Sequence, residues 1–482
     1  MFHDLREFIQ KAEEMGQCQV IKGADWNLEI SRITELSGSK PDRPLLVFDE
    51  IKGYPPGYRV ATNFFNTFRL FALAHDLPLE ARGVELIKAW REKMKGGLKP
   101  VPRQEVKTGP VEENVHLGAA VNLWEFPVPK WHELDGGRYI GTGSMVIIKD
   151  PGEGWVNLGT YRVQVIDKTT AIIHISTGRH GGVMRQKYWS RGLSCPVAVV
   201  CGGEPALWSV SASSACPFGV SEYDYTGWLR SRPIEVIRGK TVDLPIPATA
   251  EIVLEGEMSP PGVDDRPEGP FGENQGYYTG GARPDSVFRV SGVLHRNNPI
   301  ILGAPPLVMD YDLDWGMMLA RTVGLWNELD RQVPNVTGVW IYPDARTAFT
   351  VVAIKQAWAG HAAETALAVA GTYAGTYRSR FIIIVDEDID PSNISQVLWA
   401  IGTRCDPAEH IDILRGTRAT VSDAIVSPEK RRISDYTAGK AIIFACRPYH
   451  WRKQFPTSVR SSPEVLEATR QKWGSPLFGA EG

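Results

Sequence analysis

The sequence is poor in the features that mark disulfide-stapled, membrane-spanning and nucleic-acid-binding proteins. Its 482 residues include only six cysteines, and no two of them form a CxxC pair. Scattered cysteines are typical of a reduced compartment, so we expect a cytoplasmic protein with mostly buried thiols. The longest apolar runs, such as Phe381 to Val385, are too short to cross a bilayer. A formal net charge of −3 without a basic block argues against nucleic-acid binding.

Several common catalytic and targeting motifs are also absent. The chain has no GxxxxGK[ST] loop and no GxGxxG at a strand-to-helix turn, so neither a P-loop nor a Rossmann site is expected. It has no GxSxG elbow and no HExxH pair, so a serine hydrolase and a zincin are unsupported as well. The first residues place Leu5, Phe8, Ile9 and Ala12 on one helical face among charges, which indicates a helix of the fold rather than a signal peptide.

Length and pattern predict a mixed α/β protein of several domains. A chain this long exceeds one core, and 43% hydrophobic with 23% charged residues is ordinary for a globular protein. Short apolar runs between turn residues favour a β-barrel or sandwich in the middle, and helices alternate with buried strands after it. We expect an α/β domain over 1–110, a β-rich domain over 115–305, an α/β domain over 310–450 and a tail over 451–482. Within these, the pattern predicts a helix over 77–95, a linker over 96–109 and a helix over 463–473.

Two short elements in the β-rich segment carry the strongest chemical signal. Glu268-Gly-Pro-Phe-Gly-Glu273 holds two carboxylates on a segment stiffened by proline, and Asn157-Leu-Gly-Thr-Tyr-Arg162 offers an amide and a guanidinium at the same spacing. A carboxylate pair near a guanidinium can keep one carboxyl ionised and make the other a proton donor. The alternative is an ordinary surface turn with solvated charges.

Polar residues elsewhere in the same segment suggest a metal site. Asn157, His180 and Glu222 supply an amide oxygen, an imidazole and a carboxylate, a set that suits Mn²⁺ or Mg²⁺ better than a thiolate-bound metal. Single His and Asn side chains are more often satisfied structurally, so both interpretations stay open at this point.

Taken together, these stretches resemble the UbiD-type decarboxylases, which use prenylated flavin mononucleotide (prenylated FMN) to remove CO₂ from unsaturated and aromatic acids. The resemblance runs through most of the chain in the family's order, in segments 157–162, 180–182, 221–223, 250–256, 268–273, 359–362, 385–391 and 398–401. One departure is Phe444, which stands where many relatives carry Asp. This substitution is consistent either with an altered subunit contact or lid or with neutral drift in a buried strand.

The resemblance implies a specific site and architecture. It implies an N-terminal α/β domain, a central split β-barrel that binds the flavin, and a C-terminal α/β domain that mediates assembly into a homodimer or higher homo-oligomer. Arg162, Glu268 and Glu273 would be catalytic, with Glu273 the proton donor and Glu268 its charged partner through Arg162. Asn157, His180 and Glu222 would hold Mn²⁺, with a K⁺ site near Ser211 to Ser214 and Glu222. The residues implied to bind the cofactor are Asn157, Arg162, Arg179, His180, Ser213, Ser214 and Glu222.

The chemistry of decarboxylation agrees with this set of residues. Loss of CO₂ leaves an electron pair on carbon, which needs an electron sink and then a proton from a neutral acid. Side chains offer no such sink, whereas a modified flavin does. The substrate would be a small aromatic or heteroaromatic carboxylic acid, the reaction would be reversible, and a separate flavin prenyltransferase would supply the cofactor. Substrate-pocket candidates are Leu302, Met309, Thr417 and Ala419, with Arg418 or His295 as a polar contact.

Three other functions remain as alternatives. An FMN-dependent oxidoreductase on the same barrel would need an electron donor for which no signal is visible. A glycosidase using Glu268 and Glu273 would account for the 15 tryptophans but leaves the Asn, His and Glu set without a role. The third alternative is a non-catalytic assembly subunit. The presence of Arg162, Glu268 and Glu273 argues against it, because an inactive relative could have lost these residues.

Overall fold

The N-terminal unit packs helices on a small sheet whose last strand comes from much later in the chain. The structure is a computed structural model that describes residues 2–38, 43–176, 178–213, 216–308, 312–376 and 378–478. The sheet has the order β1-β2-β3-β17, with β2 and β3 antiparallel and the outer pairs parallel. Its elements are α1 (Leu5–Glu14), β1 (Cys18–Lys22), α2 (Glu29–Gly38), β2 (Leu45–Asp49), β3 (Arg59–Thr62), α3 (Phe68–His75), α4 (Gly83–Lys93) and β17 (Ile300–Leu302). Because β17 joins this sheet, the chain returns to the N-terminal unit just before the limit expected for the β-rich domain.

Local chemistry sets the helix ends in this unit. Helix α1 begins after Asp4, whose side chain accepts a hydrogen bond from the Glu7 amide, and it buries the apolar face that the sequence predicted. The helix predicted over 77–95 is shorter, because α3 ends at Asp76 in a left-handed conformation and Pro78 starts a turn closed by the Ala81 amide. Only Gly83–Lys93 of the predicted stretch is helical.

The central unit is a curled, open half-barrel of antiparallel strands. Its main path runs β6-β9-β10-β16-β14-β11-β7-β8, and β5 and β15 also pair with the long strand β16. The strands are β5 (Asn114–Leu117), β6 (Arg138–Gly141), β7 (Met145–Lys149), β8 (Val156–Gly159), β9 (Arg162–Val165), β10 (Thr170–His174), β11 (Cys195–Val200), β14 (Ile252–Met258), β15 (Asp265–Glu268) and β16 (Arg283–His295). The expectation of a split barrel is confirmed.

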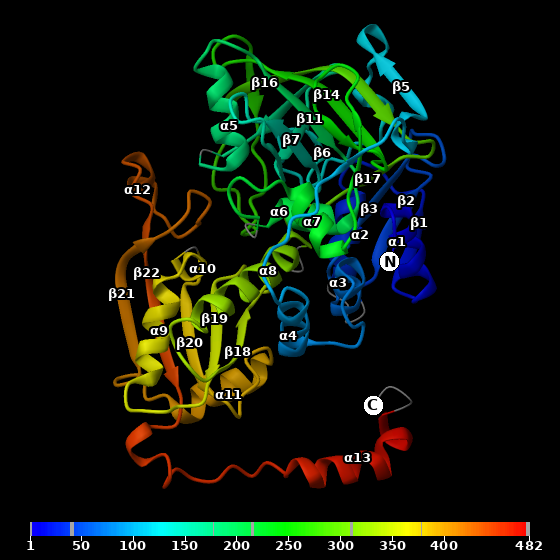
Figure 1. Ribbon diagram of the computed structural model, residues 1–482. Helices are drawn as coiled ribbons and strands as arrows, with labels where there is room; N and C mark the ends of the chain where they lie inside the picture. The colour runs from blue at the N-terminus through cyan, green and yellow to red at the C-terminus, as the bar shows by residue number, and fades with distance from the viewer. Residues whose placement is uncertain are drawn as a thin grey trace.

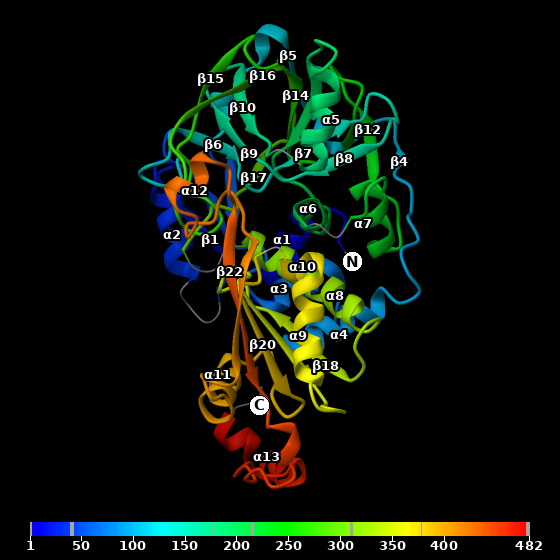
Figure 2. The same ribbon diagram turned by 90° about the vertical axis from the view of Figure 1, so that its left-hand side faces the viewer.

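Three helices border the half-barrel (Figure 1), and a small second sheet lies beside them (Figure 2). The helices are α5 (His180–Trp189), α6 (Pro205–Ala212) and α7 (Glu222–Arg230), and the single 3-10 turns nearby are η1 (Pro110–Glu112), η2 (Gly118–Ala120) and η3 (Leu123–Glu125). The second sheet has the order β13-β12-β4, made of β4 (Gln104–Glu105), β12 (Glu235–Arg238) and β13 (Pro245–Pro247). The segment predicted as a linker therefore contributes a short strand.

The C-terminal unit is a five-stranded mixed sheet flanked by helices (Figure 2). Strands β19, β20 and β22 run parallel in the middle, and β18 and β21 are antiparallel edges. Phe444 lies on β22 opposite Ile384, partly buried against the core. The elements are α8 (Asp312–Leu329), β18 (Val336–Ile341), β19 (Phe349–Ile354), α9 (His361–Gly371), α10 (Tyr373–Thr376), β20 (Phe381–Asp386), α11 (Ile394–Arg404), β21 (Ile411–Arg418), α12 (Pro428–Arg432), β22 (Thr437–Ala445) and η4 (Tyr449–Trp451).

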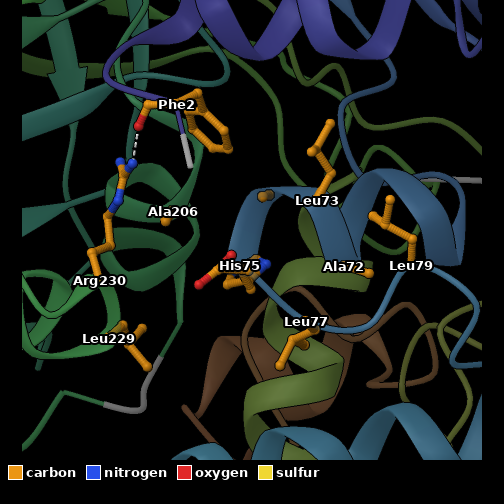
Figure 3. A pocket seen from close by; sticks show the side chains of 11 residues that line it. Phe2, Ala72, Leu73, His75, Leu77, Leu79, Ala206, Leu229 and Arg230 are labelled. Carbon is orange, nitrogen blue, oxygen red and sulfur yellow. Dashed lines mark hydrogen bonds between the residues drawn. The ribbon is translucent and has the colours of Figure 1, made fainter. Parts of the chain in front are cut away.

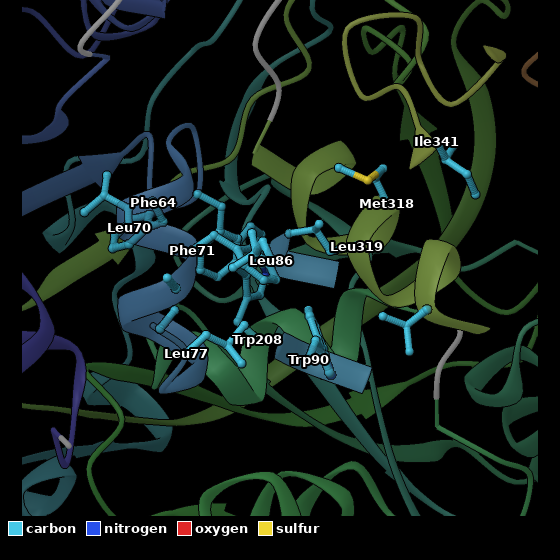
Figure 4. Packing of buried hydrophobic residues seen from close by; sticks show 14 of the residues in the cluster. Phe64, Leu70, Phe71, Leu77, Leu86, Trp90, Trp208, Met318, Leu319 and Ile341 are labelled. Carbon is cyan, nitrogen blue, oxygen red and sulfur yellow. The ribbon is translucent and has the colours of Figure 1, made fainter. Parts of the chain in front are cut away.

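One hydrophobic cluster joins the three units. Figure 4 shows Phe71 and Trp90 of the N-terminal helices meeting Trp208 of α6 and Leu319 of α8. A second cluster fills the half-barrel. Strand β7 separates the two, since Met145 and Ile147 belong to the first cluster while Val146 and Ile148 belong to the second. The half-barrel is thereby packed against both α/β units, and this packing fixes its orientation relative to them.

The chain ends in helix α13 (Pro463–Phe478), which lies apart from the rest of the protein in both views (Figures 1 and 2). Val465 and Leu466 on this helix are exposed. Among the described residues, no helix combines the length and the apolar character that crossing a bilayer requires.

Candidate active site

Arg162 links the two carboxylates that the sequence singled out. Its Nε and Nη2 donate to the two oxygens of Glu268 at 2.8 and 2.7 Å, and its Nη1 donates to Glu273 Oε1 at 3.0 Å. The Glu268 side chain is 1% exposed and the Glu273 side chain 26%. The two carboxyl groups therefore have different environments: one is buried in a two-pronged ion pair, and the other has a single hydrogen bond and access to solvent.

The turn between the carboxylates is held close to a neighbouring segment. Strand β15 ends at Glu268, and Gly269 follows in a left-handed conformation with a cis peptide bond to Pro270. The Gly136 amide donates to the Pro270 carbonyl at 2.7 Å, and a Cβ on Gly136 would lie 1.9 Å from the Gly269 oxygen. Glycine is required at 136 because the two backbones touch.

A buried carboxylate anchors the far end of the same turn. Asp135 accepts hydrogen bonds from the Gly272 amide at 3.3 Å and from the Tyr278 hydroxyl at 2.9 Å. Burial and the charge of Asp135 both raise the pKa of Tyr278, so this hydroxyl keeps its proton and remains a donor. The backbone that carries Glu273 is thus fixed by two segments outside the turn itself.

Buried groups around Glu268 surround its carboxyl with hydrogen-bond donors. The Tyr139 hydroxyl donates to Glu268 Oε1 at 3.2 Å, and burial together with the Glu268 charge raises the pKa of Tyr139. Burial alone would lower the pKa of Arg162, but the hydrogen bonds and charge of Glu268 outweigh it and raise that pKa. Arg162 is therefore a permanent cation between the two carboxylates.

A cavity of about 190 Å³ opens beside Arg162 and Glu273. Phe271 forms part of its wall, with its ring centre 5.2 Å from the Arg162 guanidinium carbon. The predicted cofactor residues Arg179 and Ser213 also line it. The other lining residues are Thr142, Gly159, Thr160, Tyr161, His174, Ser176, Ser211, Ala212, Gly272, Asn274, Ala304 and Pro306. Two of the predicted catalytic residues thus share one cavity with two further predicted cofactor residues, whereas Glu268, Asn157, His180 and Glu222 are not among its lining residues.

Two of the three predicted metal ligands are in direct contact. Asn157 Nδ2 donates to Glu222 Oε1 at 2.8 Å, and the Leu158 amide donates to Glu222 Oε2 at 2.7 Å. Burial raises the pKa of Glu222 to about 8. Among the described residues, the Asn157 side-chain oxygen is buried without a hydrogen-bond partner. A buried carboxylate beside an unpartnered oxygen fits a cation, which would satisfy both groups.

His180 lies at the start of α5, with its ring packed edge-on against Trp155 at 5.2 Å. Burial, and then the charge of Arg179, lower the pKa of His180, which favours the neutral ring that binds metals. The described contacts do not join His180 directly to Asn157 or Glu222. The third candidate ligand therefore lies on a neighbouring element and does not contact the other two directly.

The three substrate-pocket candidates that the structure describes lie away from the cavity beside Arg162. Leu302 is fully buried in the hydrophobic core, and Thr417 and Ala419 bond to Ala438 and Tyr436 in the C-terminal unit. None of these three lines the cavity beside Arg162. His295 faces Glu125 instead. Met309 and Ser214 lie outside the described residues.

Sequence reasoning missed several residues that support the site. His174 lies directly opposite Arg162 in the β9–β10 register, and its Nδ1 bonds to Asp285 at 2.8 Å while Arg283 bonds to its Nε2 at 2.7 Å. Gln164 accepts from the Gly269 amide at 3.1 Å. Gln164 is two residues beyond Arg162, on the same face of the strand, and this spacing was the one available signal.

A second cavity, of about 150 Å³, lies beside His75 and Arg230 (Figure 3). The Arg230 side chain donates to the Phe2 carbonyl at its rim. None of its lining residues belongs to the predicted site.

Comparison with known proteins decides the family. Models of the N-terminal, Rift-related and C-terminal domains of 3-octaprenyl-4-hydroxybenzoate carboxy-lyase (UbiD) match residues 9–90, 103–307 and 314–445. The chain belongs to the UbiD family. It is 32% identical to pyrrole-2-carboxylic acid decarboxylase of Pseudomonas aeruginosa over 84% of this chain and 83% of that protein. As a member of this family it is a carboxy-lyase.

Solved structures of UbiD-class enzymes share the whole fold. The open form of vanillic acid decarboxylase from Sedimentibacter hydroxybenzoicus is 27% identical, covers 99% of both chains and has a TM-score of 0.86. Its closed form has a TM-score of 0.82. An evolved dimeric form of HmfF from Pelotomaculum thermopropionicum in complex with prFMN has a TM-score of 0.81, is 26% identical and covers 97% of this chain and 98% of that chain.

Proposed function

We propose that this UbiD-family protein catalyses the reversible, non-oxidative decarboxylation of an aromatic or heteroaromatic carboxylic acid with prenylated FMN, and that Glu273 is the proton donor. The observation that carries the proposal is the shared guanidinium of Arg162, which bonds Glu268 twice and Glu273 once at the wall of a cavity. The complex of HmfF with prFMN and the aromatic-acid names of the relatives support the cofactor and the substrate class.

The side chains divide the chemical work. Prenylated FMN, when bound, supplies the sink for the electron pair that CO₂ leaves behind. Arg162 is a permanent cation because Glu268 is its buried partner, and the hydrogen bond from its Nη1 orients the Glu273 carboxyl beside the cavity. Glu273 is the more exposed carboxyl and borders the cavity, where it can deliver a proton to the carbon that has lost CO₂ and take one back in the reverse direction.

The cofactor phosphate would be held through metal ions. Asn157, His180 and Glu222 would bind Mn²⁺, for which the unpartnered Asn157 oxygen and the buried Glu222 carboxylate are suited donors. Ser211 and Ser213 line the cavity, where K⁺ would bind with Glu222, and Arg179 would meet the phosphate charge. Ser214 completes the proposed set.

The partners of the protein follow from the same proposal. A separate flavin prenyltransferase would supply the cofactor. The C-terminal unit and α13 would form a homo-oligomer, because Leu398, Trp399, Val465 and Leu466 expose apolar surface there. Removing residues from 457 onward should convert the oligomer to a smaller species in light scattering, whereas an unchanged mass would contradict this role of α13.

Co-expression tests the proposed reaction. The chain is produced with and without a flavin prenyltransferase, and the mass of the bound flavin and CO₂ release from benzoates, furoates, pyrrole and indole carboxylates are measured. We expect release only from the co-expressed protein, which carries prenylated FMN. Equal activity with ordinary FMN would overturn the proposal, and turnover that requires an electron donor would instead support the alternative of an FMN-dependent oxidoreductase.

A further inference from the structure

Two histidines and a glutamate converge at a place unrelated to the cavity of Arg162. His116 on β5, Glu125 on η3 and His295 at the end of β16 each offer one ligand atom, and these atoms all lie within 4.8 Å of one another. The register explains the approach: His116 is opposite Val293, so His295 is two residues farther along the same face of the neighbouring strand. Glu125 reaches the pair from η3, the second 3-10 turn after β5.

The spacing of the ligand atoms matches a small tetrahedral metal site. His116 Nδ1 is 3.2 Å from Glu125 Oε2, and His295 Nε2 is 3.6 Å from Glu125 Oε1. Ligands about 2.0–2.1 Å from a zinc ion at tetrahedral angles lie roughly 3.3 Å apart. The observed separations on either side of Glu125 bracket that value.

Both imidazole nitrogens lack other partners. Within the part of the chain that the structure describes, His116 Nδ1 and His295 Nε2 are buried and make no hydrogen bond. The His295 residue is 3% exposed, so water does not satisfy its ring. Buried polar atoms are almost always satisfied, and two orphaned nitrogens beside one carboxylate are an exception that a metal ion would remove.

Neighbouring groups hydrogen-bond to these side chains in the way that orients metal ligands. His295 Nδ1 bonds to the Arg296 carbonyl at 2.9 Å, which places the proton there and leaves the Nε2 lone pair directed at Glu125. The Tyr58 hydroxyl donates to Glu125 Oε1 at 3.0 Å. The Arg296 guanidinium bonds to Asp4 at 2.7 Å, so it does not compete for Glu125.

We propose that His116, Glu125 and His295 bind one divalent transition-metal ion, with Zn²⁺ the best match for two imidazoles and a carboxylate. The partly exposed His116 and Glu125 side chains leave the fourth position to water. The ion would tie β5 and η3 to the end of β16 and, through Tyr58, to the N-terminal unit. This site is separate from the ligands proposed for the flavin phosphate.

The experiment uses the full-length chain in a Glu222→Gln background, which removes the ion-binding carboxylate of the flavin site. Chelator-treated protein is titrated with Zn²⁺ and, separately, with Co²⁺, while metal content, the visible bands of four-coordinate cobalt and Tm are recorded. We expect one ion per chain, cobalt bands and a rise in Tm. Failure to bind either ion would overturn the site.

Three further variants in the same background make the assignment specific. His116→Ala and Glu125→Gln should each weaken Zn²⁺ binding by more than about 100-fold, beyond the effect of losing an outer partner. Both positions are partly exposed, so these variants should fold. His450→Ala, at an exposed histidine, is the matched control and should bind as the parent does. Undiminished binding by both ligand variants would place the ion elsewhere and overturn the proposal.

Discussion

Arg162 and Glu268 form a buried two-pronged ion pair, with hydrogen bonds of 2.8 and 2.7 Å between β9 and the end of β15. The same guanidinium reaches Glu273 with its third nitrogen. One cation thereby fixes the positions of both carboxyl groups, although it shields only one of them from solvent. This asymmetry is the physical basis for assigning the two groups different roles.

Glu273→Gln should strongly reduce decarboxylation while leaving the cofactor bound. The amide keeps the shape of the side chain but cannot donate a proton as an acid does, so we expect kcat to fall roughly 100- to 10,000-fold. Flavin content and ring H/D exchange report on binding and proton transfer separately. Glu257→Gln, at an exposed glutamate, is the control. A Glu273→Gln enzyme with normal turnover would remove Glu273 from the reaction.

The Arg162–Glu268 pair should be strongly coupled in stability. Removing one partner strands a buried charge, so Arg162→Met and Glu268→Leu should each lower the free energy of unfolding by about 3–5 kcal/mol, and the double variant by less than the sum. The exposed pair Arg32–Glu133, also 2.7 Å apart, is a matched control for which we expect a coupling below about 1 kcal/mol. Denaturant titration of the two cycles measures both couplings, and equal values would contradict the role of burial.

Gly136→Ala should reduce activity although residue 136 contributes no side chain to the cavity. The added Cβ would overlap the Gly269 carbonyl and displace the turn that carries Glu268 and Glu273. A shift of 1 Å at reacting groups can cost about 100-fold in rate. Gly281→Ala is the control because its Cβ would meet nothing within 4 Å. The kcat values of the two variants are compared. Comparable values would show that the turn tolerates the added Cβ at residue 136.

Gln275 should connect the turn over 268–273 to the C-terminal unit. Its amide donates to Asp423 at 3.0 Å, and Asp423 also accepts from Arg380 at 2.5 Å. Gln275→Ala frees the segment just after Glu273 from this anchor, so we expect kcat to fall by up to about 100-fold with flavin content unchanged. Hydrogen exchange should increase in residues 269–281. Gln10→Ala on exposed helix surface is the control, and unaltered exchange in the Gln275 variant would rule out the anchor.

His75 should make the protein sensitive to acid. Burial lowers the pKa of His75 to about 3 from its ordinary 6.5, and its ring nitrogens contact Phe71 O and Ser209 Oγ. The unfolded chain binds the proton at higher pH than the folded one, so stability is complete above pH 6.5 and declines as the pH falls towards 3. The maximal slope from one group is about 1.4 kcal/mol per pH unit.

The His75→Gln variant should reduce this slope, as measured by denaturant titration at successive pH values. His450→Gln, at an exposed histidine, should leave the slope unchanged. Equal slopes in the His75 variant and the parent protein would show that this ring is not the source of the acid sensitivity.

The sequence by itself determined the family, the mixed α/β class and the split barrel, and it singled out Arg162, Glu268 and Glu273, which the fold brings into contact. These are encoded locally, because period-two runs predict strands and short motifs keep their spacing along the chain. The domain limits stay predictions. The catalytic roles of Arg162, Glu268 and Glu273 and the metal-binding roles of Asn157, His180 and Glu222 stay predictions too, because contacts within the protein do not test a reaction or a bound ion.

The tertiary structure alone decided which distant groups meet. Asp135 and Tyr139 support the turn over 268–273 across long separations in sequence, and no local pattern marks them. The meeting of His116 with His295 likewise depends on the pairing of β5 with β16. Strand register and burial are properties of the folded chain, and they set the distances and charges on which the chemistry of both sites depends.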